Sequence, residues 1–394
     1  ARNRSRSRSL FDLIDPAAYY TRPIALRNPI VFYEGHLPAF SIISFLNRGL
    51  GRPGVDPRLE ELFARGIDPE SVDSADPRSG ASTPWPRRED VLAFGDAADA
   101  LVIDAIKYAA FDESRPAMRH GEALFTALEH EAMHQETLLY MWRRLPYEQK
   151  VRPTYVRYET RAAVPGRATA NVPAGTATLG VNRGDITFGW DNEFNAHTEA
   201  VAAFEVDVHS VTNEDYLPFV EAGHAEPPAF WLRKDAAWFW RGMFEPIPLP
   251  PSWPVYVSHE DASAFANWRG RRLMTEAEYH RAAQGVDPRG GHADFAGWEP
   301  VPAGSRPAGV SAWGVHDLAG NGWEWTSSVF APLPGFEPMV SYPEYSAEFF
   351  DGQHYVMKGA SSATAKELIR PSFRNWFRPN YPYVTAKFRT AVDA

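Results

Sequence analysis

The chain has 394 residues, of which 44% are hydrophobic and 23% charged, and its formal net charge is −10. A negative charge of this size argues against nucleic acid or an anionic membrane as the main partner. The chain contains no cysteine, which excludes a disulfide framework, a zinc–thiolate site and a cysteine nucleophile and is compatible with a cytoplasmic protein. No apolar run approaches the length of a membrane span.

Two early segments have a composition typical of irregular structure. Arginine and serine alternate from Arg2 to Ser9, and because this run is short and the rest of the chain is acidic, we expect residues 1–9 to be a disordered basic tail. Residues 51–86 are rich in Pro, Gly, Ser and Asp. We expect them to form a long loop with one short helix near residues 59–64.

The remainder of the first half is predicted to be helical. Apolar side chains recur at helical spacing in segments 28–47, 87–110 and 117–145, as on the buried faces of amphipathic helices. Helices joined in this way predict an up-and-down bundle over residues 10–155.

Beyond this bundle the chain becomes dense in Gly, Pro and Trp, with short β-like runs such as Val201–Val208 and Tyr355–Lys358. Two helices are predicted at residues 258–269 and 275–283, and a capping box opens the second of them. These features predict a separate α+β domain over residues 156–394.

The sharpest pattern in the sequence is a pair of histidines. His130 and His134 lie four residues apart on a segment predicted to be helical, so both imidazoles can reach one ion. A pair of satisfied core histidines is the alternative. A metal inside a bundle takes ligands from facing helices, and His36, on an apolar segment, is the best third ligand. Three imidazoles would leave positions open for O2 and a substrate, although the set also suits zinc or nickel.

Several blocks of the second half follow the order found in one known domain. They are Phe188–Glu193 with Ala196–His197, Val211–Tyr216, Gly270–Tyr279 and Gly314–Thr326. Over residues 173–391 they resemble the formylglycine-generating-enzyme domain, a variant of the C-type lectin fold, although the paired cysteines of the enzymes that gave it its name are absent. The first half resembles the DinB-like helical bundle, and His36, His130 and His134 match its three-histidine metal site.

A DinB-like bundle fused ahead of this domain resembles the ergothioneine sulfoxide synthase / selenoneine synthase family. The resemblance implies Fe(II) at the three histidines, O2 as co-substrate and a C–S or C–Se bond formed at the imidazole C2 of hercynine (trimethylated histidine). It also implies a cleft between the two domains, with the C-terminal domain as its lid. Members use a tyrosine as proton or hydrogen donor. Tyr342 and Tyr345 both lie in the matching region, and we slightly prefer Tyr342.

The same resemblance implies which residues hold hercynine. Asn375 and Trp376 match the family's hercynine-binding positions, and an aromatic face suits a quaternary ammonium group. Arg374 or Arg378 would pair with the hercynine carboxylate, with a structural ion pair as the alternative for each arginine.

Two positions and one short segment depart from the usual family pattern. Phe377 stands where synthases that use γ-glutamylcysteine commonly have Asp, Met133 stands where a hercynine-binding Gln is often found, and residues 359–362 read Gly-Ala-Ser-Ser instead of Gly-Gly-Ser-Trp. Loss of the carboxylate removes a charge-assisted contact of about 1.5–3 kcal/mol with the donor's ammonium group. We therefore favour a selenoneine synthase that takes a selenosugar, with Phe377 and Met133 among its substrate-binding residues.

Three alternatives remain open. The first is an ergothioneine sulfoxide synthase that uses cysteine or γ-glutamylcysteine as the thiol donor. The second is a DinB-type metal-dependent thiol transferase that uses zinc or nickel without O2, and the third is a non-catalytic binding module. The sequence gives no indication of the oligomeric state.

Overall fold

The computed structural model describes residues 2–64, 84–154 and 156–394. Its contacts divide the chain into two compact units. The helical unit comprises residues 1–153 and 338–343, and the sheet unit comprises residues 154–337 and 344–394. Residues 65–83 of the predicted long loop lie outside the described residues.

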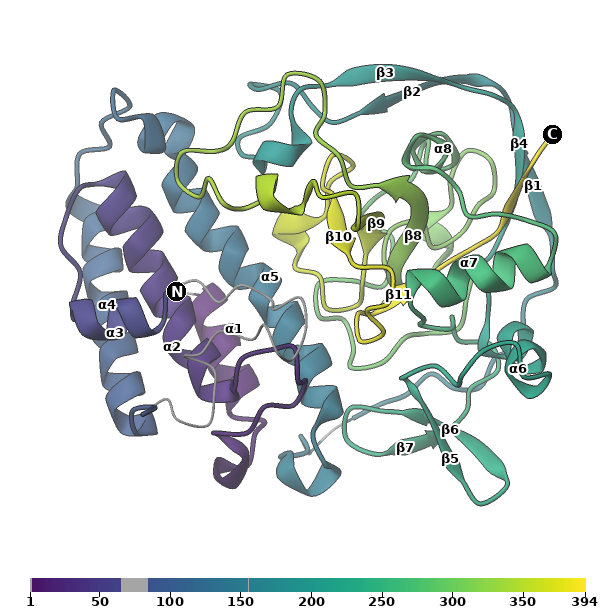
Figure 1. The fold of residues 1–394 in the computed structure, drawn as a ribbon, viewed down its shortest axis with the longest axis horizontal. Helices are drawn as coiled ribbons and strands as arrows, with labels where there is room; N and C mark the ends of the chain where they lie inside the picture. The colour runs from purple at the N-terminus through teal and green to yellow at the C-terminus, as the bar shows by residue number, and fades with distance from the viewer. Residues whose placement is uncertain (1, 65–83, 155) are drawn as a thin grey trace. The chain divides into compact units, whose positions relative to one another are not determined.

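The helical unit is built around α2. Its helices, within the described ranges, are α1 (Arg2–Phe11), α2 (Ile30–Ser41), the π-helix η2 (Ile42–Gly49) that continues α2, α3 (Pro57–Leu62), α4 (Arg88–Tyr108) and α5 (Glu122–Arg144), with the short turns η1 (Pro16–Ala18), η5 (Pro116–Gly121) and η6 (Tyr147–Gln149). Helix α2 packs against α4 and α5, and α1 packs against α5 (Figure 1). Every residue of α2 except Glu34 is buried, which makes it the central helix of the bundle.

The short helix predicted near residues 59–64 is α3, and its start has a local cause. The Asp56 side chain accepts hydrogen bonds from the backbone N–H groups of Arg58 and Leu59, and Pro57 occupies the first helical turn. Both features stabilise a helix N-terminus.

Residues 2–9 of the predicted disordered tail are instead most of helix α1, so this prediction was wrong. Arg4 Nε lies 3.0 Å from Asp99 Oδ1 on α4, and Ser7 Oγ donates a hydrogen bond of 2.6 Å to Glu131 Oε1 on α5. These partners lie about a hundred residues away in sequence. Tertiary pairing of this kind overrides the weak helix propensity of an Arg/Ser run.

The sheet unit combines short strands with three α-helices in the part of the chain that the structure describes (Figure 1). The strands are β1 (Thr169–Val172), β2 (Gly175–Leu179), β3 (His197–Val201), β4 (Phe204–Asp207), β5 (Trp231–Lys234), β6 (Ala237–Arg241), β7 (Pro246–Pro248), β8 (Gly322–Val329), β9 (Tyr355–Ala360), β10 (Asn375–Phe377), β11 (Ala386–Lys387) and β12 (Ala391–Asp393). The helices are α6 (Asn213–Glu221), α7 (His259–Trp268) and α8 (Glu276–Ala282), with the short turns η7 (Asp191–Glu193), η8 (Pro307–Gly309), η9 (Ala347–Phe349) and η10 (Lys366–Leu368).

The strands form four small sheets, with orders β1-β4-β12, β10-β9-β8-β11, β2-β3 and β5-β6-β7. Strand β8 is central to the largest of them and buries both Trp323 and Trp325. At its edge, β10 pairs antiparallel with β9, so that Trp376 lies opposite Val356. The predicted hercynine-binding residues Asn375 and Trp376 therefore lie on an edge strand.

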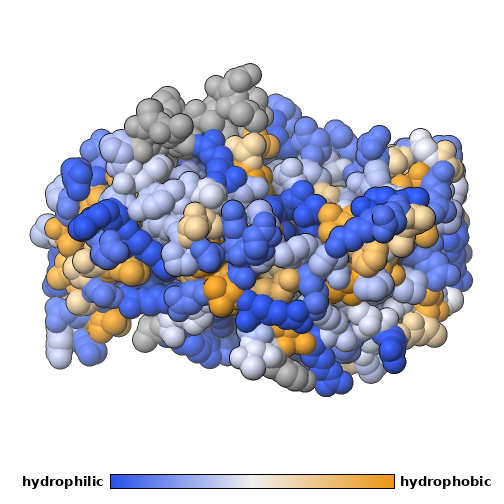
Figure 2. All heavy atoms as spheres, turned by 90° about the horizontal axis from the view of Figure 1, so that it is seen from below, coloured by the Kyte–Doolittle hydropathy of each residue, from blue (hydrophilic) through white to orange (hydrophobic). Residues whose placement is uncertain are grey.

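The surface carries mostly polar residues on the face that is drawn in Figure 2, where apolar residues occur in scattered groups. Among the described helices, none combines the length and the apolar character needed to cross a bilayer.

Candidate active site

Three histidines converge inside the helical unit. His36 comes from α2, and His130 and His134 project one turn apart from α5. One ring nitrogen of each lies within 4.8 Å of those of the other two, and the Nε2 atoms of His130 and His134 are 3.1 Å apart. Two imidazole nitrogens bound at right angles to one ion at ~2.1 Å lie ~3 Å apart. The arrangement therefore fits a metal ion.

The protonation state of the three rings also fits a metal. Burial lowers the pKa of His36 to about 4, against the opposing effect of the Phe63 carbonyl. Burial, followed by the charge of the neighbouring rings, holds the pKa values of His130 and His134 well below the usual value. All three imidazoles are therefore neutral at pH 7, which is the form that binds a metal.

A hydrogen bond fixes the orientation of His36. Its Nδ1 lies 2.8 Å from the carbonyl oxygen of Phe63. An Nδ1–H that donates to this carbonyl leaves Nε2 as the atom available to an ion, as in many metal-binding histidines. Phe63 directly follows α3, so the end of this short helix supplies the hydrogen-bond partner of His36.

Aromatic rings pack on the three histidines. Phe32 stacks on His36 with centroids 4.9 Å apart, and Phe40 stacks on His130 with centroids 3.4 Å apart. Tyr33 lies at 5.7 Å from the His134 ring. The apolar spacing of segment 28–47 did not assign Phe32, Tyr33 and Phe40 to the site, although their separation of three and four residues from His36 on one helix could have done so.

Tyr342 lies beside the histidine group. Its ring centroid is 6.1 Å from that of His130 and 5.1 Å from that of Phe40. The preceding residue fixes this segment to the bundle, because the Ser341 N–H and hydroxyl both donate to Glu122 Oε1, at 2.8 and 2.9 Å. The Ser341 carbonyl also accepts a hydrogen bond from Arg48.

Tyr345, the second candidate, belongs to the sheet unit. It is buried, stacks on Trp190 with centroids 3.9 Å apart, and meets Trp376 edge to face at 5.1 Å. Of the two tyrosines, only Tyr342 is in the same unit as the three histidines.

The predicted hercynine-binding strand carries a half-buried aromatic group. Trp376 stacks on Phe330 with centroids 4.2 Å apart and an interplanar angle of 8°. The Asn375 Oδ1 accepts a hydrogen bond from the Trp376 backbone N–H. Phe377 stacks on Tyr381 with centroids 5.0 Å apart.

Comparison with known proteins identifies the family. Residues 156–394 match the model described as the sulfatase-modifying factor enzyme 1-like domain, and residues 1–138 match the DinB superfamily. The hercynine oxygenase of Mycolicibacterium thermoresistibile is 30% identical over 99% of this chain and 93% of its own length. The chain belongs to the hercynine oxygenase family.

Two fungal relatives are longer than this chain. The protein named ergothioneine biosynthesis protein 1 is 28% identical in Neurospora crassa, over 94% of this chain and 54% of its own length. The corresponding protein of Schizosaccharomyces pombe is 28% identical over 94% of this chain and 52% of its own length. The chain thus spans about half the length of these two relatives.

Both arginines that are candidates for binding the hercynine carboxylate have carboxylate partners within the protein. Arg374 is buried and forms two parallel bonds of 3.0 Å with Glu276. Arg378 is more exposed, donates to Gln353 and lies 3.7 Å from Asp351. The geometry favours the structural ion pair for Arg374. For Arg378, contact with a substrate stays a prediction.

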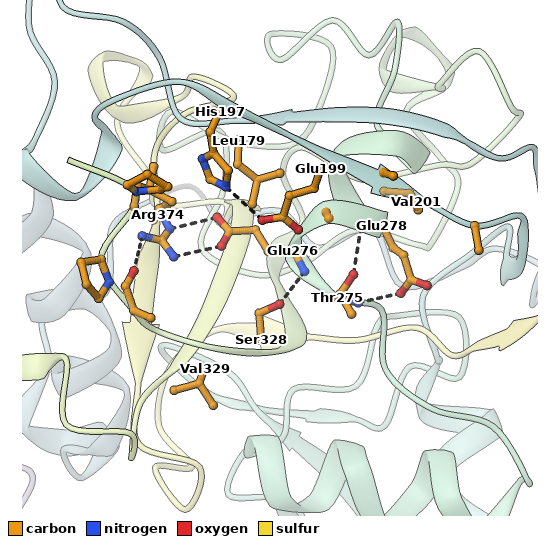
Figure 3. Close-up of a pocket in the computed structure, with 17 residues that line it drawn as sticks. Leu179, His197, Glu199, Val201, Thr275, Glu276, Glu278, Ser328, Val329 and Arg374 are labelled. Atoms are coloured by element: carbon orange, nitrogen blue, oxygen red, sulfur yellow. Dashed lines mark hydrogen bonds and ion pairs between the residues drawn. The ribbon is translucent and has the colours of Figure 1, made fainter. Parts of the chain in front are cut away.

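Glu276 and Arg374 also line a pocket of about 610 Å³ in the sheet unit (Figure 3). His197 and Glu199 of β3 also line this pocket, and their side chains lie 3.0 Å apart (Figure 3). No local sequence pattern predicts this pocket, because its walls come from segments far apart in the chain.

Met133 precedes His134 on α5 and is half-buried. It stands in the helical unit, whereas Phe377 stands on β10 of the sheet unit. A role of either residue in substrate binding stays a prediction.

Proposed function

We propose that this member of the hercynine oxygenase family is a non-heme iron(II), O2-dependent oxidoreductase that forms a C–S or C–Se bond at the imidazole C2 of hercynine. The observation that carries the proposal is the convergence of three neutral imidazoles beside a tyrosine that is fixed to the same unit. Family membership supports hercynine as the substrate.

The proposed iron ligands are His36, His130 and His134, which match the three-nitrogen sets that leave open positions on an octahedral ion. When bound, iron supplies the redox capacity to reduce O2 and lowers the pKa of the donor's thiol or selenol by coordination. The chain's own residues then have to orient the ligands, exclude water, bind hercynine and move a proton.

Phe32 and Phe40 hold the planes of His36 and His130 by stacking and keep water from those faces. Tyr342 is the proposed proton donor, because its backbone is fixed by the bonds of Ser341 to Glu122 and its ring lies beside His130. A positioned acid of this kind typically contributes about 10²–10⁴-fold to a rate.

Trp376 is the proposed contact for the trimethylammonium group of hercynine. Phe330 covers one face of the indole, and the ring is half-buried, so the cation is expected at the uncovered part of the ring. A contact of this kind contributes about 0.5–2 kcal/mol. Asn375, the preceding residue on β10, is the proposed neighbouring polar contact.

The proposed donor is a selenosugar, which makes the chain a selenoneine synthase. Phe377 offers no charge to the ammonium group of γ-glutamylcysteine, and it stacks on Tyr381 to give an aromatic surface that suits a neutral sugar ring. Ergothioneine synthesis with cysteine or γ-glutamylcysteine is the second candidate, favoured by the names of the two fungal relatives.

A donor screen tests the proposal. The purified chain is incubated with hercynine, Fe(II) and O2 and with a selenosugar, cysteine or γ-glutamylcysteine, and products are identified by mass spectrometry. We expect a hercynine-derived selenium product from the selenosugar, and none under argon. Turnover of a thiol under argon with zinc or nickel would instead assign a thiol transferase, and tight hercynine binding without any product would assign a binding module.

A further inference from the structure

The guanidinium of Arg374 makes four hydrogen bonds within the sheet unit. Its Nε and Nη2 donate to the two carboxylate oxygens of Glu276, both at 3.0 Å, as Figure 3 shows. Its Nη1 donates to the carbonyl oxygens of Asn192 and Ala331, at 3.3 and 2.9 Å. The Arg374 and Glu276 side chains are only 3% and 4% exposed. Four of the five guanidinium N–H groups of Arg374 therefore have partners within the sheet unit.

The same guanidinium contacts an aromatic stack. Arg374 Cζ lies 5.0 Å from the ring centroid of Phe330, and Phe330 in turn stacks nearly parallel on Trp376 at 4.2 Å. Arg374 is also two residues before Trp376 in the chain, directly ahead of β10. It therefore reaches the indole both along the backbone and through Phe330.

Glu276 anchors this arrangement from α8. Its backbone N–H donates to Ser328 Oγ at 2.8 Å (Figure 3), and Ser328 lies two residues before Phe330. Lys358 Nζ lies 3.6 Å from the same carboxylate. Glu276 thus links the start of α8 to the segments that carry both rings of the stack.

We infer that Arg374 is a positioning residue which, held by Glu276, sets the orientation of Trp376 through Phe330 and does not bind the hercynine carboxylate. The inference rests on the proposed role of Trp376 in binding the trimethylammonium group. This role of the buried ion pair differs from recognition of the hercynine carboxylate. The two roles predict different affinities for hercynine analogues that lack either the carboxylate or the trimethylammonium group.

The test uses three ligands and isothermal titration calorimetry on the iron-loaded full chain under argon. They are hercynine, its carboxylate-free analogue Nα-trimethylhistamine, and its cation-free analogue imidazolepropionate. For Arg374→Lys we expect about a tenfold weaker affinity, ~1.4 kcal/mol, for hercynine and for trimethylhistamine alike, with imidazolepropionate changed less than about twofold.

Phe330→Leu should give the same pattern although it leaves both members of the ion pair in place. Phe330→Tyr, which keeps the stack, should retain wild-type affinity. Arg272→Lys is the control. Arg272 also forms two hydrogen bonds with a glutamate of α8, in this case Glu278. The control variant should leave all three affinities unchanged. If Arg374→Lys does not fold, Glu276→Gln, which weakens the hold on Arg374, replaces it and should give the same pattern across the three ligands.

Two results would overturn the inference. Arg374→Lys could weaken hercynine but not trimethylhistamine, which would make Arg374 the carboxylate partner. Alternatively, all three ligands could weaken equally, which would leave only a general role in folding. Failure of the wild-type chain to bind hercynine would instead reject the proposed function. In that case a crystal structure of Arg374→Lys decides the inference, since an unchanged Phe330–Trp376 stack contradicts it.

Discussion

Tyr342 and Tyr345 lie three residues apart in sequence but belong to different units of the structure. Tyr342 contacts the group around His130, whereas Tyr345 stacks on Trp190 within the sheet unit. The sequence could not separate them, because the choice depends on bonds from Ser341 to Glu122, more than two hundred residues away.

Tyr342→Phe removes the hydroxyl and keeps the ring. We expect kcat to fall by about 10²-fold, because a positioned proton donor is lost, while the hercynine affinity stays the same. Steady-state kinetics with saturating donor measure kcat, and calorimetry under argon measures the hercynine affinity. A loss confined to Tyr345→Phe would reverse the assignment.

Phe377→Asp restores the carboxylate found in synthases that use γ-glutamylcysteine. We expect its KM for γ-glutamylcysteine to fall by about 10- to 100-fold, because a charge-assisted contact of about 1.5–3 kcal/mol becomes available. Phe377→Asn, which lacks the charge, should change it far less. Efficient use of γ-glutamylcysteine by the wild-type chain would contradict the donor assignment.

At the scale of elements, α1 shows where sequence patterns fail. The Arg/Ser run has the composition of a disordered segment, yet Arg4 and Ser7 find acidic partners on α4 and α5. Only the fold brings these partners together. In contrast, the helices that carry His36, His130 and His134 follow from apolar spacing, because their buried faces are continuous in sequence.

Ser7→Ala tests the docking of α1. The variant leaves the buried carboxylate of Glu131 without its 2.6 Å hydrogen bond, so we expect a loss of about 1–3 kcal/mol in the stability of the helical unit. Urea unfolding followed by circular dichroism measures it. Ser9→Ala, an exposed serine on the same helix, should change stability by less than about 0.5 kcal/mol. Equal effects would show that α1 is not held by this bond.

The link between α8 and β10 should make stability depend on pH. Burial would raise the pKa of Glu276, but Arg374 and Lys358 outweigh it and lower the pKa from 4.5 to about 2. A carboxylate whose pKa is lower in the folded state than in the unfolded state stabilises the fold at pH values above its unfolded-state pKa. This stabilisation is lost as the pH falls through the folded-state pKa. The advantage of wild type over Glu276→Gln should therefore shrink between pH 4.5 and about 2.

Chemical unfolding at a series of pH values measures that difference. Glu199→Gln, which removes an exposed carboxylate of the same pocket, controls for the loss of a charge as such. A difference between wild type and Glu276→Gln that is constant from pH 7 to pH 2 would contradict the ionised buried pair.

At the scale of the whole molecule, the proposed site residues are distributed over both units. The histidine group and Tyr342 belong to the helical unit, and Asn375 and Trp376 belong to the sheet unit. Motif order in the sequence predicted both domains, because each motif is local. It could not predict that segment 338–343 packs with the first unit, since such an excursion leaves no local pattern.

Iron binding tests the central claim most directly. Iron content is measured by elemental analysis after anaerobic loading and desalting, for wild type, His36→Ala, His130→Ala, His134→Ala and the exposed control His120→Ala. We predict about one iron per chain for wild type and His120→Ala and less than about a tenth of that for the other three, because three neutral imidazoles form the site. Full iron content with O2-dependent turnover in His134→Ala would contradict the account.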